Sequence, residues 1–401
     1  MKLFIILQDV VIFRSNWANL IDKENYFLLI RSNKLLHVKE QLNYFNKVIT
    51  LTEYNLKNIS NELDVILNSS DYKWSDVKVL CNDEYCLPLA AKLREKFNIV
   101  GDNSNIIAKF TNKLVMKNLL HNRVKKPKYI EYNKNDIAID EIEKILNYPI
   151  IAKPTNLAAC DGVVKIHCKN ELESWLNNNK NTSDYELDEY IEGVLFHIDS
   201  VIFNNEILNV FVGEYSSPVA EFITGKAVGT RIVNEKDKNY IKLIEYNRNL
   251  LEIMQDLPNC VTHLEVFINK KEEIVFLEIA ARAAGGMIPQ MYQLAYGINI
   301  EEIHFQLQMG KKVNIPINLD RYVGWLWYPQ IEGMYLDKNT DLKIKSQHIL
   351  YWDIDERVKQ KKAVSIRDRL GGIIIHNKNY EQLIDDYNWL CNHYFPYKKS
   401  L

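Results

Sequence analysis

The sequence predicts an α/β unit followed by an α+β body, and three observations support this. Over the first hundred residues, short apolar runs alternate with helical patterns, which is typical of a parallel sheet covered by helices. Beyond Pro149, β-rich segments follow one another with turn residues between them, which favours antiparallel pairing. A length of 401 residues suits two or three structural units.

The N-terminal unit is expected to be built from four short strands. The first apolar run is broken by Gln8 and Asp9, and no small-residue cleavage site follows, so we interpret it as a strand and not as a secretion signal. Strands are expected at residues 3–7, 26–30, 47–50 and 77–81, with a helix at 86–97.

Two more helices are expected before the β-rich part of the chain, at residues 108–120 and 139–146. Five strands then follow, at 150–153, 162–168, 185–190, 197–203 and 206–215. The final part of the chain is expected to contain strands 322–327 and 371–376 and a helix at 380–393.

Composition excludes several classes of partner. A formal net charge of -2 provides no basic surface for nucleic acid. No apolar stretch reaches the roughly 18 residues of a membrane span. The six cysteines form no CxxC pair, so we expect free thiols and a cytoplasmic protein.

A hairpin is expected around the polar turn at residues 270–273, between strands 261–268 and 274–279. If the strands pair symmetrically about this turn, Glu265 lies opposite Glu278, at about 5 Å between Cβ atoms. Two facing carboxylates require a cation or a shared proton, and Mg²⁺ fits best. The alternative is a register shift that sends one glutamate to solvent, or pairing of each with a nearby Lys or Arg.

Arg282 follows Glu278 by four residues and returns to the same face of an extended chain. A guanidinium beside a metal is typical of phosphate chemistry. Gly285 and Gly286 then permit close approach of the backbone to a ligand, although an ordinary turn explains them equally well.

Lys153 ends the apolar strand 150–153 and precedes a loop of small and polar residues, 155–162, which includes Asp161 and Gly162. A lysine at that position can reach phosphate oxygens. The loop has a single glycine, so it is not a P-loop, and a surface turn is the alternative. Lys113 lies on the expected helix 108–120, whose lysines could equally form a solvated face.

The segment 185–193 is a strand that runs into an acidic turn. Free backbone groups beside apolar side chains there could meet the edge of an adenine ring. An acidic edge strand whose charges discourage aggregation is the alternative.

In this order, the segments resemble the ATP-grasp superfamily over nearly the whole chain. The resemblance implies a Rossmann-like N-terminal domain (1–105), a central α+β subdomain with the lid and phosphate loop (106–187), and a C-terminal antiparallel subdomain with the metal site and tail (188–401). It implies ATP and Mg²⁺ as cofactors, with Mn²⁺ as an alternative, small-molecule substrates, and a homodimer as a common assembly.

The resemblance also assigns roles to individual residues. Lys113 and Lys153 look like the lysines that hold ATP phosphates, Asp188, Glu189 and Ile191 like the adenine contacts, and Asp161 and Gly162 like part of the phosphate loop. Glu265 and Glu278 look like the magnesium ligands and Arg282 like the arginine that stabilises the transferring phosphoryl group. Asn112, Leu195 and Ala280 depart from the common form, so ribose contact and the coordination of a second metal are open.

The segments 196–199, 213–215 and 278–286 look most like bacterial L-amino-acid ligases that make dipeptides. This implies an ATP-dependent carboxylate–amine ligase that works through an acyl phosphate, with His197, Asp199, Glu214, Gly285 and Gly286 on the substrate side. His197 and Asp199 share one strand face, so exposed polar residues on a half-solvated strand are the alternative. A carboxylase, a purine-pathway ligase and a non-catalytic nucleotide-binding protein are the rival interpretations.

Overall fold

The N-terminal unit is a parallel four-stranded sheet in the order β3-β2-β1-β4. The computed structural model describes residues 1–10, 13–133, 137–158, 160–182, 184–315 and 318–400. Strands β1 (Leu3–Gln8), β2 (Asn25–Arg31), β3 (Lys47–Leu51) and β4 (Val77–Cys81) are accompanied by α1 (Leu56–Asn68), α2 (Leu87–Phe97) and α3 (Ser104–Ala108). The 3₁₀ segments are η1 (Trp17–Asn19), η2 (Ser32–Tyr44) and η3 (Trp74–Asp76).

The central unit is an antiparallel sheet in the order β5-β8-β6-β7, with two helices of its own. Its elements are α4 (Lys113–Leu120), β5 (Tyr129–Tyr132), α5 (Ile139–Ile145), β6 (Ile150–Pro154), β7 (Val164–Ile166), α6 (Lys169–Asn178) and β8 (Tyr185–Glu189). Helix α4 leads into this unit and packs on α7 and β13 of the large sheet.

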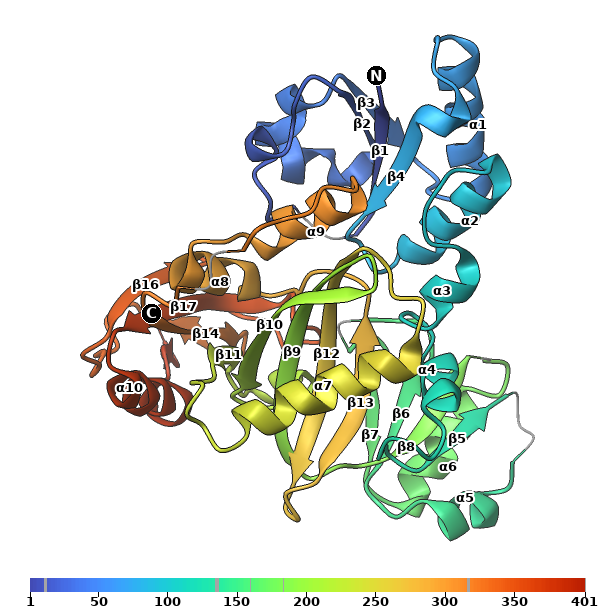
Figure 1. The fold of residues 1–401 in the computed structure, drawn as a ribbon. Coiled ribbons are helices and arrows are strands. Elements are labelled where there is room, and N and C mark those ends of the chain that lie inside the picture. Colours follow the sequence, from blue (N-terminus) through green and yellow to red (C-terminus); the bar gives the residue numbers. More distant parts are fainter. Residues whose placement is uncertain (11–12, 134–136, 159, 183, 316–317, 401) are drawn as a thin grey trace.

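The body of the protein is an eight-stranded sheet in the order β13-β12-β9-β10-β11-β14-β17-β16 (Figure 1). Its strands are β9 (Gly193–Phe203), β10 (Glu206–Tyr215), β11 (Val228–Ile232), β12 (Cys260–Asn269), β13 (Ile274–Ala280), β14 (Tyr322–Pro329), β16 (Gln347–Trp352) and β17 (Arg369–Asn377). The remaining elements are η4 (Val219–Thr224), α7 (Tyr240–Met254), α8 (Ile288–Tyr296), α9 (Ile300–Gln308), α10 (Tyr380–His393) and the pair β15 (Tyr335–Leu336) and β18 (Tyr397–Lys398).

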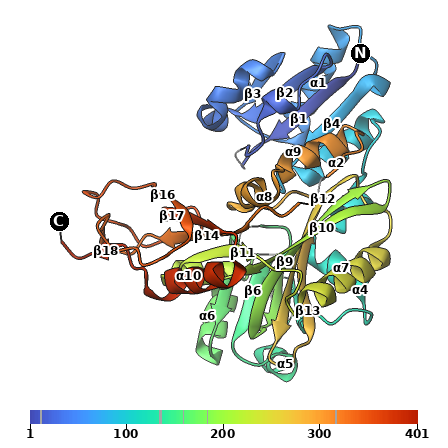
Figure 2. The same cartoon turned by 60° about the vertical axis from the view of Figure 1, so that its left-hand side comes forward.

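Helix α9 joins the N-terminal sheet to the large sheet, and in Figure 2 it lies between them. Phe305 is fully buried in the aromatic cluster of the N-terminal unit, beside Trp17 at 4.9 Å between ring centroids. On the same helix, His304 accepts a hydrogen bond from the amide of Val261 and donates one to the carbonyl of Cys81. Helix α9 therefore packs against both the N-terminal sheet and the large sheet and connects them.

Two expectations about elements are wrong. The expected helix 108–120 starts five residues late, at Lys113, because the Asn112 side chain accepts hydrogen bonds from the amides of Leu114 and Val115 and caps α4, whereas Ala108 ends the separate helix α3. The expected boundary between residues 187 and 188 falls inside β8, which pairs with both β5 and β6 through Asp188. Residues 188 and 189 therefore lie in the central sheet.

The strand and helix types are otherwise as expected, and α10 and β10 have the expected bounds. Among the described residues, none of the helices combines the length and the apolar character needed to cross a membrane.

Candidate active site

The hairpin of β12 and β13 brings Glu265 and Glu278 directly opposite each other. Nearer the turn, Ile268 pairs with Ile274 and Val266 pairs with Phe276, and the register shifts between Val266 and Glu265. Leu277 is the extra residue in β13, so the hairpin contains a β-bulge. Without this bulge, Leu277 and not Glu278 would face Glu265.

The bulge also changes which face of the sheet the β13 side chains occupy. Before it, Ile274 and Phe276 lie in the apolar cluster beneath α7; after it, Ile279 and Ala281 do. Because strand side chains alternate, Glu278 would join that apolar cluster if the strand were regular. The bulge therefore directs the carboxylate to the opposite face, where Glu265 lies.

Glu278 is a carboxylate in a basic environment. Lys113 Nζ lies 3.1 Å from its Oε2. Burial raises the pKa of Glu278, but Lys113 and Lys153 outweigh that effect and lower the pKa to about 2. The main chain of Lys113 also donates to the carbonyl of Thr155, so the start of α4 is tied to the start of the loop 155–162.

Glu265 is held by two buried side chains. Tyr215 donates its hydroxyl to Glu265 Oε1 at 2.6 Å, and His263 Nε2 lies 3.4 Å from the same oxygen. His263 precedes Glu265 by two residues on β12, and Tyr215 ends β10, which is separated from β12 by β9. The described contacts of Glu265 therefore fix its Oε1.

His197 and Asp199 are fully buried, so the alternative of exposed polar residues is wrong. Asp199 accepts hydrogen bonds from His197 Nδ1 at 2.8 Å, His263 Nδ1 at 2.7 Å and the Tyr292 hydroxyl at 2.6 Å. Burial opposes ionisation of Asp199, but the two histidines outweigh it and hold the pKa of this carboxyl below its usual range. This cluster lies behind Glu265 and supports it through His263.

Lys153 belongs to a group of four buried charges. Its Nζ lies 2.8 Å from Asp188 and 3.3 Å from Glu186, and Lys117 Nζ lies 2.6 Å from Asp188 and 3.0 Å from Glu186. Burial lowers the pKa of Lys153, but the two carboxylates and Glu278 raise it above its usual value. The two lysines and two carboxylates balance each other in charge.

Strand β8 has no free edge, because it lies between β5 and β6. The alternative of an acidic edge strand is therefore wrong, and the Asp188 carboxylate is engaged by two lysines. The strand ends at Glu189, so Ile191 lies in the connection to β9, beyond the paired backbone. Contact of Asp188, Glu189 and Ile191 with adenine stays a prediction.

Arg282 links the hairpin to the N-terminal unit. Its Nε donates to Glu84 Oε2 at 2.5 Å, and the amide of Ala283 donates to Asn82. Gly285 and Gly286 follow, and Gly286 has a φ of +63°. A Cβ at Gly286 would lie 2.7 Å from the Trp325 ring, so only glycine fits there without a shift of the indole.

The loop 155–162 contacts the N-terminal unit and the segment that precedes β17. The Tyr85 hydroxyl donates to Asp161 Oδ2 at 2.7 Å, and Arg367 lies 3.3 Å from the same oxygen. Gly162 has a φ of +76° and starts the return toward β7. Ala159 lies outside the described residues, and the remainder of the loop stands beside Lys113, which donates to the carbonyl of Leu157.

Glu214 lies one residue before Tyr215 and faces away from the carboxylate pair. Its Oε2 accepts a hydrogen bond from Arg231 at 2.6 Å, and Arg231 also donates to the Tyr380 hydroxyl. Burial raises the pKa of Glu214 despite the neighbouring guanidinium. These contacts give Glu214 a structural partner, and a substrate role for it stays a prediction.

The residues that sequence reasoning missed are those whose partners lie far away in the chain. The alternative of a solvated lysine face is wrong for Lys117, which is fully buried, and Glu84 and Tyr85 were not considered. The four-residue spacing of Lys113 and Lys117 places both on one face of α4, which is the one signal that could have identified Lys117.

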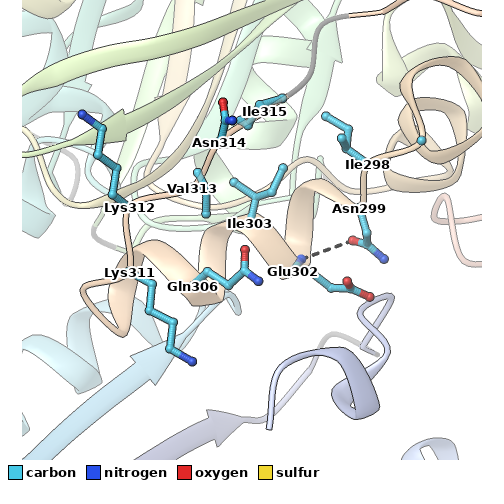
Figure 3. A pocket seen from close by; sticks show the side chains of 11 residues that line it. Ile298, Asn299, Glu302, Ile303, Gln306, Lys311, Lys312, Val313, Asn314 and Ile315 are labelled. Carbon is cyan, nitrogen blue, oxygen red and sulfur yellow. Dashed lines mark hydrogen bonds between the residues drawn. The ribbon is translucent and has the colours of Figure 1, made fainter. Parts of the chain in front are cut away.

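A separate groove of about 460 Å³ follows α9 and the segment after it (Figure 3). Asn299, Glu302, Gln306, Lys311 and Lys312 lie along it, and Asn299 accepts a hydrogen bond from the Glu302 amide. It shares no residue with the carboxylate pair, the four buried charges or the loop 155–162.

Residues 146–290, which include both glutamates, Lys153 and Arg282, match the family model described as an ATP-grasp domain. The chain contains an ATP-grasp domain. It is 25% identical over 255 residues to the L-arginine-specific L-amino acid ligase of Bacillus subtilis. That match covers 60% of this chain and 60% of the relative.

Two solved structures share the fold of nearly the whole chain. The L-amino acid ligase from Bacillus licheniformis superposes with a TM-score of 0.73 at 16% identity, covering 97% of each chain. The N5-carboxyaminoimidazole synthetase from Staphylococcus aureus, complexed with ADP, superposes with a TM-score of 0.67 at 15% identity, covering 97% of each chain. At these identities the likeness establishes the fold.

Proposed function

We propose that this protein is an ATP-dependent ligase that joins a carboxylate, with an amino acid as the first choice, to an amine through an acyl phosphate. The observation that carries the proposal is the facing pair Glu265 and Glu278, with Lys113, Lys153 and Arg282 around it. Two carboxylates inside a ring of cations suit a polyphosphate bound with a divalent metal. The ligase named for the Bacillus subtilis relative supports the substrate class.

The carboxylate pair fits a magnesium ion. The low pKa of Glu278 keeps it ionised at neutral pH, and its side chain is 30% exposed, whereas that of Glu265 is 12% exposed. Both supply the oxygen ligands that Mg²⁺ prefers, with Mn²⁺ as an alternative. The ion would neutralise charge on the phosphate oxygens when bound.

In the first step, an oxygen of the substrate carboxylate attacks the γ-phosphorus of ATP, and the bond to ADP breaks. Lys113 and Lys153 hold phosphate oxygens, and Arg282 balances the charge of the transferred group. In the second step, the amine nitrogen attacks the acyl carbon, phosphate leaves and the nitrogen loses a proton. The loop 155–162 excludes water, which would otherwise hydrolyse the acyl phosphate.

The test is ADP and phosphate release from MgATP with pooled amino acids, together with mass analysis of the products. We expect release that depends on the amino acids and an amide product, and a loss of at least 100-fold in Glu278→Gln. The matched control is Glu252→Gln, which changes an exposed glutamate on α7 and should retain full activity. Release that ignores the amino acids, or that survives Glu278→Gln, contradicts the proposal.

A further inference from the structure

Three arginines from distant parts of the chain gather beside the turn at Gly286. Arg14, from the N-terminal unit, donates its Nε to the carbonyl of Gly286 at 2.8 Å. Arg282 lies four residues earlier in the same segment and is held by Glu84. Arg369 starts β17 and lies near enough to Arg14 to repel its charge.

Aromatic side chains connect Arg369 to this turn. The guanidinium of Arg369 lies over the Trp327 ring, 4.3 Å from its centroid. Trp327 Nε1 donates to the Tyr351 hydroxyl at 2.5 Å, and that hydroxyl lies 3.2 Å from Met287 Sδ. Arg14, Arg369, Trp327 and Tyr351 therefore lie close together beside the turn, and we call this group the basic wall.

The charges on this wall act on one another. The pKa of Arg14 is lowered, first by burial and then by repulsion from Arg282 and Arg369, although Glu301 opposes the change. Arg369 has an acidic partner, Asp353, at 3.1 Å, but the two side chains are 31% and 34% exposed, so solvent screens this pair. Arg369 uses Nε for Asp353, and a guanidinium carries further donors in its planar fork.

We propose that one of the two substrates carries an anionic group that takes no part in the reaction and that this group binds at the basic wall, between Arg14 and Arg369. The inference rests on the proposed function, in which Arg282 balances the charge of the transferred phosphoryl group. Arginine matches a carboxylate in geometry, and the Trp327 and Tyr351 rings can cover the carbon skeleton beside it. A cationic substrate group is repelled there, which sets this chain apart from a relative named as L-arginine-specific.

The anionic group can come from either substrate, and paired compounds distinguish the two sources. Aspartate against asparagine varies a spare charge on the carboxylate substrate, and glycine against glycinamide varies one on the amine. ADP release is measured for each pair with wild type and Arg369→Gln, whose half-exposed side chain makes a folded variant the expectation. The control is Arg357→Gln, since Arg357 is an exposed arginine that also pairs with an aspartate.

In one pair we expect wild type to prefer the acid over its amide by at least tenfold in kcat/KM. Arg369→Gln should bring that ratio near one and leave KM for ATP unchanged, whereas Arg357→Gln should keep the preference. Ratios near one in both pairs, or a preference that survives both Arg369→Gln and Arg14→Gln, would overturn the inference.

A second readout needs no turnover. In the presence of MgADP, the preferred acid should raise the melting temperature of wild type more than its amide does, and this difference should vanish in Arg369→Gln. If no compound supports ADP release but the difference is present, the proposed reaction is wrong and the anion site stands. If ADP release depends on amino acids but acids and amides behave alike, the reaction stands and the anion site is wrong.

Discussion

Lys117 is buried completely, and its ammonium group is held between Glu186 and Asp188. Burial lowers the pKa of Lys117, and the neighbouring Lys153 lowers it further against the pull of the two carboxylates. If Lys153 turns to bind phosphate, Lys117 is the cation left to balance the two acids. We therefore assign Lys117 a positioning role: it holds Glu186 and Asp188, which in turn contact Lys153.

Lys117→Met should show this role. Removing one cation from a buried set leaves an uncompensated carboxylate, which costs about 3–5 kcal/mol of unfolding free energy. Lys153 should be retained more strongly by Glu186 and Asp188, so KM for ATP should rise more than kcat falls. Urea unfolding and steady-state kinetics measure the two effects, with exposed Lys144→Met as control. An unchanged KM for ATP in a folded variant would show that the role is structural alone.

Elements were easier to predict than their partners. The local apolar pattern located β10 and α10 with their bounds. The break at Asn112 depends on a side-chain cap that competes with a continuous helical pattern, and it was missed. The position of β8 between two strands depends on pairing over long sequence distances, which local pattern does not encode.

The carboxylate pair was predicted from symmetry about the turn, but the hairpin reaches it by another route. Near the turn, the strand register differs by one residue from the symmetric pairing. The extra residue Leu277 shifts the register back, so that Glu265 pairs with Glu278. Bulges are placed by packing on both faces of a sheet, here the α7 cluster on one side and the site on the other.

Deletion of Leu277 tests this arrangement. Without Leu277, Glu278 follows Phe276 directly and, because strand side chains alternate, still faces Glu265 although the bulge is gone. We therefore expect the deletion to keep ADP release within about tenfold of wild type and to lower the melting temperature, because the packing of the leucine is lost. Leu277→Ala keeps the bulge and should lose similar stability, so a loss of ADP release of at least 100-fold in the deletion alone would show that the bulge itself is needed to place the carboxylate.

At the scale of the whole molecule, His304 on α9 bonds to both sheets as a neutral ring. Its Nδ1 accepts from the Val261 amide at 3.1 Å, and its Nε2 donates to the Cys81 carbonyl at 3.0 Å. Burial lowers its pKa from 6.5 to about 4. A proton on Nδ1 would point at the N–H of Val261 and break this hydrogen bond. Protonation of His304 is therefore unfavourable in the folded protein.

The folded pKa lies below the unfolded one, so the unfolded chain binds the proton first as pH falls. Stability should therefore be lost between pH 6.5 and about 4, by ~3 kcal/mol at most from this group. Urea unfolding across this window compares wild type with His304→Gln, in which the loss should be smaller, and with exposed His348→Gln, in which it should persist. Equal slopes in all three proteins would exclude His304 as the source.

The shared helix α9 also has a consequence for biosynthesis. The N-terminal sheet is complete once β4 has left the ribosome, yet Phe305, which seals its aromatic cluster, belongs to a helix synthesised much later. At roughly 5–20 residues per second, the intervening stretch of about 220 residues takes on the order of 10–45 s to translate. During that interval Trp17 and its aromatic neighbours are not yet covered by Phe305. The nascent chain therefore exposes an apolar aromatic surface, to which chaperones can bind, until α9 has been synthesised.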